Sequence, residues 1–185
     1  PMPILLAVVL NEIGNQTFKR VAQTISYLTH FISWIIVASL LNNLLSPSTG
    51  VINAFIQQLG GDPIYFLADK NWFRPILVIS NIWKENGWSS VVYLAALSGI
   101  DPSLYEAAIG DGATRGQRIT RITLPSIMPI AVTMLILSMG SIMSAGFDQV
   151  FNLYSPQVYD VGDIRATYVY RRGLVDRSYS FSTAV

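Results

Sequence analysis

The residues most able to bind another molecule gather in one short segment, "DPSLYEAAIGDGATRGQRITRITLPSI", at positions 101–127. Arg115, Arg118 and Arg121 recur at i, i+3 and i+6, so on a helix they would form one basic stripe. Glu106 is followed by two small residues, Ala107 and Ala108. One interpretation of the segment is a small, rigid protrusion that fits a groove of another protein. The alternative is an ordinary cytoplasmic loop with a solvated basic face.

A second polar group lies inside an apolar stretch, "WFRPILVISNIWKENGWSSVVYLAALSGI", from Trp72 to Ile100. Lys84 and Glu85 fall near its middle. Charges at membrane depth are costly, so they usually face a polar interior and mark a pathway. Alternatively, Trp83 and Trp88 bracket an interfacial break, and Lys84 extends its ammonium group to the membrane surface. The sequence leaves both interpretations open.

The residues needed for catalysis are scarce. The chain has one histidine, His30, and no cysteine. An intramembrane enzyme would need paired carboxylates or clustered histidines at one depth, and Glu85 is far in sequence from Asp111 and Asp148. The phosphate-binding pattern G-x-x-x-x-G-K-[ST] does not occur in the sequence. We therefore expect no enzyme activity, and we interpret His30 as a neutral helix residue.

The composition indicates a membrane protein. Apolar residues make up 51% of the 185 residues and charged residues only 12%, against roughly 25% charged residues in soluble domains. The stretches between Arg20 and Asp62 and from Pro125 to Phe147 carry no Asp, Glu, Lys or Arg. The net charge of +1 gives no reason to expect a nucleic-acid partner.

Spanning a bilayer takes roughly 20 apolar residues as a helix. Ile25 to Leu45 and Leu124 to Phe147 meet this requirement, and Trp72 to Ile100 is a weaker candidate. We interpret the apolar start, "PMPILLAVVL", as the tail of a truncated helix, and the chain as a fragment with one membrane domain over residues 1–185. Val51 to Leu59 is expected to form a short amphipathic surface helix.

The protrusion itself has clear local signals. Asp101 is a good N-cap, and Pro102 suits the first helical position. A helix is therefore expected from Ser103 to Ile109, followed by a turn at Gly110–Gly112 and a second helix that carries the arginines. Pro125 predicts a bend or a new helix start.

The spacing of Glu106-Ala107-Ala108, Gly112, Ile122 and Leu124-Pro125 matches every fixed position of the EAA loop of bacterial ABC import permeases. The flanks, among them "IWKENGWSSVVYLAALSGIDPSLYEAA" and "GFDQVFNLYSPQVYD", resemble the polysaccharide and oligosaccharide permeases of the LplB type. The resemblance covers nearly the whole chain. It implies an all-α integral membrane fold, the type I (MetI-like) ABC importer bundle, with about three full spans and a truncated one.

The resemblance also implies a role for each residue of the loop, which extends over about 101–125. Glu106 would pair with a basic group on a cytoplasmic ABC ATPase dimer, and Ala107 and Ala108 would allow close approach. Gly112 would make the turn. The remaining positions would tie the loop to the last span: Ile122, Leu124 and Pro125. Gly110 departs from the pattern as an additional glycine before the turn.

The other partners implied are a second permease subunit of different sequence, an extracellular sugar-binding lipoprotein and membrane lipid. ATP and magnesium would be bound by the ATPase and no cofactor by this chain. The protein would lie in the cytoplasmic membrane of a bacterium, with the loop in the cytoplasm. Candidate residues of the sugar path are Asn81, Trp83, Lys84, Glu85, Asp148, Gln149 and Asn152, although packing and interfacial roles would explain each of them.

Charge bias does not support this orientation by itself. It places Lys19, Arg20, Arg115, Arg118 and Arg121 inside, and Lys70, Arg74, Arg165, Arg171, Arg172 and Arg177 outside. Two other functions stay open. An ion-coupled secondary transporter could use Lys84 and Glu85 as a relay but would leave the EAA spacing unexplained, and a structural membrane subunit would need no path.

Overall fold

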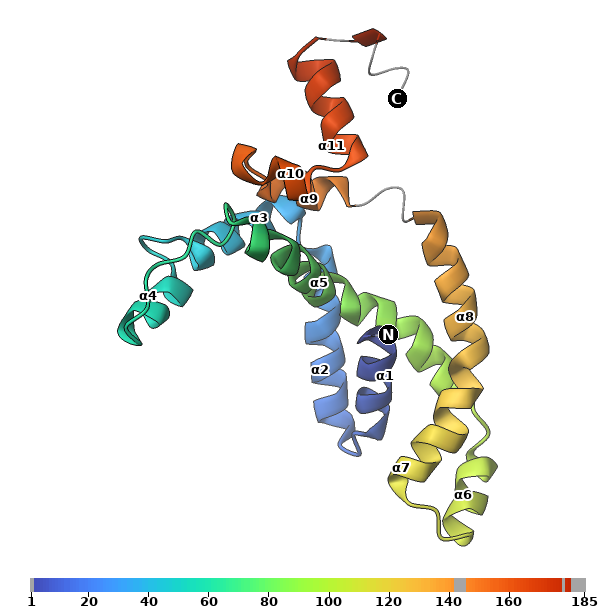
Figure 1. Cartoon of the computed structure of the whole chain (residues 1–185). Helices are drawn as coiled ribbons and strands as arrows, with labels where there is room; N and C mark the ends of the chain where they lie inside the picture. The colour runs from blue at the N-terminus through green and yellow to red at the C-terminus, as the bar shows by residue number, and fades with distance from the viewer. Residues whose placement is uncertain (1, 142–145, 178, 181–185) are drawn as a thin grey trace. The chain divides into compact units, whose positions relative to one another are not determined.

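The computed structural model describes residues 2–141, 146–177 and 179–180, and within these ranges the regular structure is entirely helical. This confirms the predicted all-α fold. Contacts divide the chain into two compact units, which are described separately (Figure 1). Unit 1 comprises Pro1–Phe31 and Asn81–Ser141, and unit 2 comprises Ile32–Ser80 and Ile142–Val185.

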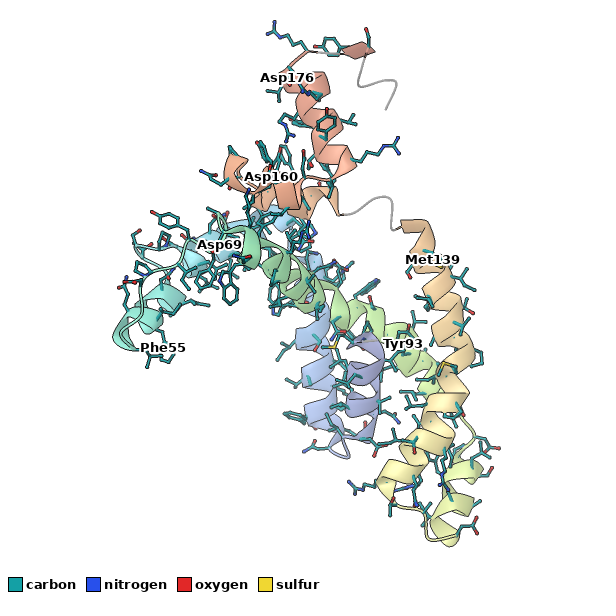
Figure 2. All side chains as sticks on the ribbon, viewed as in Figure 1. Phe55, Asp69, Tyr93, Met139, Asp160 and Asp176 are labelled. Carbon is teal, nitrogen blue, oxygen red and sulfur yellow. The ribbon has the colours of Figure 1, made fainter. Side chains whose placement is uncertain are left out.

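Unit 1 contains the predicted protrusion. Its elements are α1 (Met2–Glu12), α2 (Gln16–Leu28), η1 (Thr29–Phe31), the second part of α5 (Lys70–Ser98), α6 (Pro102–Gly110), α7 (Arg115–Arg118), η2 (Ile119–Thr123) and α8 (Leu124–Ser141). Its core joins Ala7 of α1, Tyr93 and Leu97 of α5, and Ile127 of α8. Tyr93 is labelled in Figure 2. The helices that flank the protrusion are thus packed together directly above it.

Unit 2 combines helices with irregular segments. Its elements are α3 (Trp34–Leu45), α4 (Val51–Gln58), the first part of α5, α9 (Phe147–Leu153), η4 (Pro156–Val158), α10 (Tyr159–Gly162), α11 (Arg165–Tyr170) and η5 (Arg171–Val175). Its core joins Ala38, Phe73, Leu153 and Val158. Helix α4 confirms the short helix predicted over Val51 to Leu59, and Figure 2 shows its exposed Phe55.

The first predicted span, Ile25 to Leu45, is wrong as a single helix. The chain leaves the helical conformation after η1, and Ser33 begins α3 with extended backbone (φ −61°, ψ 145°). Its side chain accepts a hydrogen bond from the Ile35 amide, which satisfies one of the free donors at the new helix start. The break uses a serine cap, with neither glycine nor proline, so the apolar run did not reveal it.

The third predicted span, Leu124 to Phe147, has different limits. Helix α8 continues α7 and η2 without interruption from Arg115, and Phe147 belongs to α9. Positions 142–145 of the predicted span lie outside the described residues. Of the bend or new helix start predicted at Pro125, the structure shows α8 beginning at Leu124, directly after η2, a π turn in which the Leu124 amide bonds to the Ile119 carbonyl. This wider turn directly precedes the proline, whose ring would otherwise clash with the carbonyl four residues earlier.

The second predicted span is one continuous helix through its polar middle, because α5 runs unbroken over 29 residues. Within the described residues one helix, Arg115–Gly140, is long and apolar enough to cross a membrane. Gln16–Phe31 and Trp34–Leu45 qualify only if they are counted together as a single broken span.

Helix α2 packs very closely against α5 at Gly87, a buried residue. A Cβ atom at this position would lie 2.0 Å from the Ser26 carbonyl oxygen and 2.9 Å from the Ser26 Cβ. Backbone atoms cannot move aside as a flexible side chain could. Glycine is therefore the one residue that permits this helix contact.

Replacing Gly87 by alanine should destabilise the protein, because a methyl group forces α2 away from α5. We expect a loss of about 1–3 kcal/mol, the usual cost of overpacking. Thermal unfolding of the full-length protein in detergent would measure it. Gly116→Ala is the control, since a Cβ there meets nothing within 4 Å. Equal midpoints for the two variants would contradict the close contact.

Candidate functional site

Helix α6 begins as the local signals predicted. The Asp101 side chain accepts a hydrogen bond of 2.9 Å from the Ser103 amide, and Pro102 occupies the first turn. This backbone hydrogen bond holds the pKa of Asp101 below its usual value. The cap therefore keeps its charge, and its favourable interaction with the helix N-terminus, into mildly acid solution.

The side chains of α6 divide between two faces. Tyr105 and Ala108 are half-buried against the rest of the loop, whereas Glu106 and Ala107 are exposed. An acidic group and a small residue are thus presented outward side by side. Such a surface can approach another protein closely and form an ion pair with it.

The turn after α6 is fixed by glycine and by a second cap. Gly112 adopts φ 75°, in the left-handed region that side chains rarely occupy. Thr114 then begins α7 in a capping box, with hydrogen bonds between it and Gln117 in both directions. Gly110, the departure from the family pattern, is the last residue of α6.

A hydrogen bond ties α6 to the start of the long helix. The Tyr105 hydroxyl lies 3.0 Å from Thr123 Oγ1, and Thr123 is only 1% exposed within the π turn. The sequence did not reveal this partner, since no local signal marks Thr123. Of the predicted tying residues, Ile122 and Leu124 are half-buried, with Leu124 packed on the core of unit 1, and Pro125 is exposed.

A polar hollow of about 360 Å³ lies inside the loop, between α6 and α7. Its lining includes Ala108, Asp111, Arg118 and Arg121. The Nε atom of Arg118 is buried there and has no hydrogen-bond partner among the described residues. The predicted basic stripe is therefore not uniformly solvated.

Lys84 and Glu85 are held by the end of η1. Lys84 is 5% exposed; its ammonium group donates to the His30 carbonyl at 2.6 Å and lies 3.4 Å from Glu85 Oε1. Glu85 Oε2 is 2.8 Å from His30 Nδ1, and the His30 ring stacks on Trp88 at 4.9 Å. A cation at the carbonyl end of a helix is favourable. Lys84 is inside the protein, as the pathway interpretation required, but it faces a helix end.

The remaining path candidates are placed differently. Asn81 and Trp83 are exposed in unit 1. In unit 2, Asp148 is exposed on the first turn of α9, and Asn152 donates to its carbonyl. Gln149 is buried, and its amide donates to the Leu77 carbonyl at 2.7 Å and to Ser80 Oγ at 2.9 Å. Its donor group is therefore occupied by α5.

The described part of the chain holds no group of three His, Asp or Glu side chains that could bind a metal ion. Comparison with known proteins places the geometry in context. The family model for the binding-protein-dependent transport system inner membrane component matches residues 1–147. The chain belongs to this family. The match covers the loop and the membrane-crossing helix that follows it.

Two curated relatives from Bacillus subtilis (strain 168) are each 46% identical over 185 residues. They are Protein LplB and the polygalacturonan/rhamnogalacturonan transport system permease protein YteP. The alignment covers 100% of this chain and 58% of each relative. This chain therefore spans somewhat more than half the length of these permeases.

A solved structure shares both sequence and fold with this chain. It is the crystal structure of a bacterial ABC transporter involved in the import of the acidic polysaccharide alginate. The TM-score is 0.95 at 50% identity, over 100% of this chain and 64% of the other. The MetI-like importer fold expected from the EAA spacing is thereby confirmed.

The positive φ of Gly112 makes a direct prediction for the loop. Gly112→Ala should cost about 1–2 kcal/mol, the usual penalty for a side chain in the left-handed region. Gly110→Ala is the matched control, because Gly110 is helical and a Cβ there meets nothing within 4 Å. Limited proteolysis of the full-length protein should cleave the Gly112 variant faster than wild type and the Gly110 variant no faster. Equal cleavage of both variants would show that the turn is not constrained.

The buried ammonium group makes a second prediction. Lys84→Met should lower the apparent stability by about 1–3 kcal/mol, because the part-buried His30 carbonyl loses its charged donor. Lys70→Met is the control, since Lys70 pairs with Asp160 on the surface, where both side chains are more than half exposed. Exposed ion pairs contribute little, so the unfolding midpoint should hardly move. Equal shifts in the two variants would show that Lys84 does not hold the end of η1.

Proposed function

We propose that this chain is the membrane-spanning permease part of an ATP-driven ABC importer that takes up oligosaccharides or polysaccharide fragments. The observation that supports this most strongly is the loop over residues 101–125. Its outward-facing Glu106 and Ala107 sit on a helix that is bonded through Tyr105 to the start of the membrane-crossing helix.

In this proposal, α6 seats in a cleft of a cytoplasmic ATPase, and Glu106 pairs with a basic group there. Movement of the cleft then acts on α6, on the Tyr105–Thr123 contact and on the helix that starts at Arg115. A loop that transmits movement to helices must be rigid, because a flexible loop would bend instead of moving them. The Asp101 cap, the Thr114 capping box and the unbroken helix provide that stiffness.

The orientation follows from the position of the ATPase. If α6 meets a cytoplasmic protein, Arg115 lies at the inner end of the membrane-crossing helix and Gly140 at the outer end. In this orientation an extracellular binding protein delivers the substrate on the outer side. The numbers of Lys and Arg residues on the two sides do not favour this orientation, so it depends on the loop.

The substrate class is drawn from the similar proteins. The relative YteP is named as a permease of a polygalacturonan/rhamnogalacturonan transport system, and the similar crystal structure is of a transporter involved in alginate import. A bacterial alginate transporter was also solved in complex with a periplasmic protein that holds an alginate pentasaccharide. The second permease, the ATPase and the sugar-binding protein would be separate chains. ATP hydrolysis would belong to the ATPase, and this chain would carry out no chemical step itself.

One observation favours the ion-coupled alternative. His30 of η1 and Glu85 of α5, the helix that precedes the loop, form a hydrogen-bonded pair of titratable groups 2.8 Å apart. This pair would have to change partners during transport to carry protons. The proposed importer needs no such change, because the pair there serves to hold η1 against α5.

A cysteine at position 107 would test the coupling role, since these 185 residues contain none. Ala107→Cys in the full-length permease should form a disulfide with a single cysteine in the cleft of its ATPase, and nucleotide should change the yield. Ala108→Cys is the matched control, because Ala108 is half-buried and faces the hollow inside the loop. Non-reducing gel electrophoresis of the co-expressed proteins would report the product.

The cross-link should be strong at position 107 and weak at position 108. If neither cysteine reacts although both proteins are folded and present, α6 does not dock as proposed. Uptake that continues in ATP-depleted vesicles and stops when the proton gradient is removed would support the secondary transporter instead.

A further inference from the structure

Unit 2 contains a cavity of about 340 Å³. It is open to the surface and is lined by the end of α3, by the segment 65–68 and by the chain from α9 into η4. Small-molecule sites in proteins usually measure about 300–1,000 Å³, so this cavity is large enough for one small ring. Apart from Asn152, none of its lining residues was a candidate from the sequence.

The lining is polar but uncharged. Its hydrogen-bonding side chains are amides and hydroxyls, and no Asp, Glu, Lys, Arg or His lines it among the described residues: Asn42, Tyr65, Asn152, Tyr154, Ser155 and Gln157 are the polar groups that matter here. Amides and hydroxyls can both donate and accept. They suit a ligand whose own groups are hydroxyls, and they offer a carboxylate no counter-charge.

Ser155 offers this wall a hydrogen-bonding group that the described protein residues do not use. Its Oγ atom is buried and has no hydrogen-bond partner among the described residues. Buried polar atoms are normally paired, because leaving one unpaired costs free energy. A hydroxyl group bound in the cavity would supply that partner.

One wall of the cavity is held by a buried amide. Asn53 is 1% exposed, and its side chain donates to the carbonyls of Leu45, Ser46 and Ile64 and accepts from the Ile64 amide. These bonds join the end of α3 to the segment that leads to Tyr65. The wall is therefore formed before any ligand arrives.

The opposite wall is held by an aromatic and ionic cluster. The Tyr154 ring lies 5.0 Å from the Tyr159 ring, and the Arg171 guanidinium lies over Tyr159 at 4.2 Å. Asp163 fixes Arg171 through an ion pair of 2.5 Å. The charge of Arg171 is thus paired with Asp163 within the wall, and the residue of this cluster that lines the cavity is the uncharged Tyr154.

We propose that this cavity is a saccharide subsite that binds one neutral pyranose ring. The amides and Ser155 bond its hydroxyl groups, and an aromatic face of Tyr65, which is 67% exposed, covers its C–H face. This subsite depends on the proposed function, in which the permease receives an oligosaccharide from an extracellular binding protein. A neutral residue of an oligosaccharide enters the cavity, while acidic residues of the same chain stay outside.

The test uses the full-length permease in its assembled transporter, with a single cysteine, Gln157→Cys, at the edge of the cavity. A maleimide labels this cysteine in the presence of galactooligosaccharide, rhamnogalacturonan oligosaccharide or alginate pentasaccharide. Uptake of each saccharide by wild type is measured in parallel. A saccharide that is taken up and has a neutral ring should slow labelling.

Asn42→Ala, added to the cysteine variant, should raise the concentration for half-protection about tenfold, as expected when a hydrogen bond to the ligand is lost. Asn43→Ala is the matched control, because Asn43 is the exposed neighbour on α3 and lies outside the lining. It should leave protection unchanged.

Three results would overturn the subsite. If a saccharide with a neutral ring is taken up but does not slow maleimide labelling of Gln157→Cys, the subsite is wrong and the importer function stands. Equal effects of the Asn42 and Asn43 variants would show that protection comes from a change elsewhere. If wild type takes up none of the three saccharides, the proposed function and the subsite both fail.

Discussion

The helix that runs unbroken from Arg115 to Gly140 is the constraint on which the functional argument depends. A proline at position 125 would ordinarily kink such a helix and absorb any movement applied to its end. The π turn at Ile119–Thr123 removes the clash and keeps the backbone hydrogen bonds running. It also carries Thr123, whose hydroxyl meets Tyr105 of α6. The same turn therefore preserves the helix and attaches the loop to it.

The middle of α5 holds α2 and η1 in place. Lys84 and Gly87 are three residues apart, so they share one face of the helix. Gly87 lets the α2 backbone approach, and Lys84 bonds the carbonyl of His30 where η1 ends. A buried ammonium would be very costly without such a partner. Lys84 was a candidate for the substrate path. In the structure its hydrogen bond to His30 explains how η1 can end within an apolar region.

Unit 2 relies on buried amides for the same reason. The chain leaves helix α3 at Leu45, where backbone carbonyls need partners away from water. Asn53 supplies them at the end of α3, and Gln149 bonds Leu77 and Ser80 of α5. These bonds hold irregular segments in fixed positions. A cavity bounded by such segments keeps its shape, which is the property a binding subsite requires.

The sequence determined those features of this protein that depend on neighbouring residues. The Asp101 cap, the helix after Pro102 and the turn at Gly112 were predicted, because each depends on bonds within a few positions. The EAA spacing likewise led to the family. Only the tertiary structure decided the break after Phe31, the partner of Tyr105 and the surroundings of Lys84. The bond from Lys84 to His30 joins residues 54 positions apart, and that from Gln149 to Leu77 joins residues 72 apart. Side chains choose such partners only when packing brings distant helices together, and no local pattern records that choice.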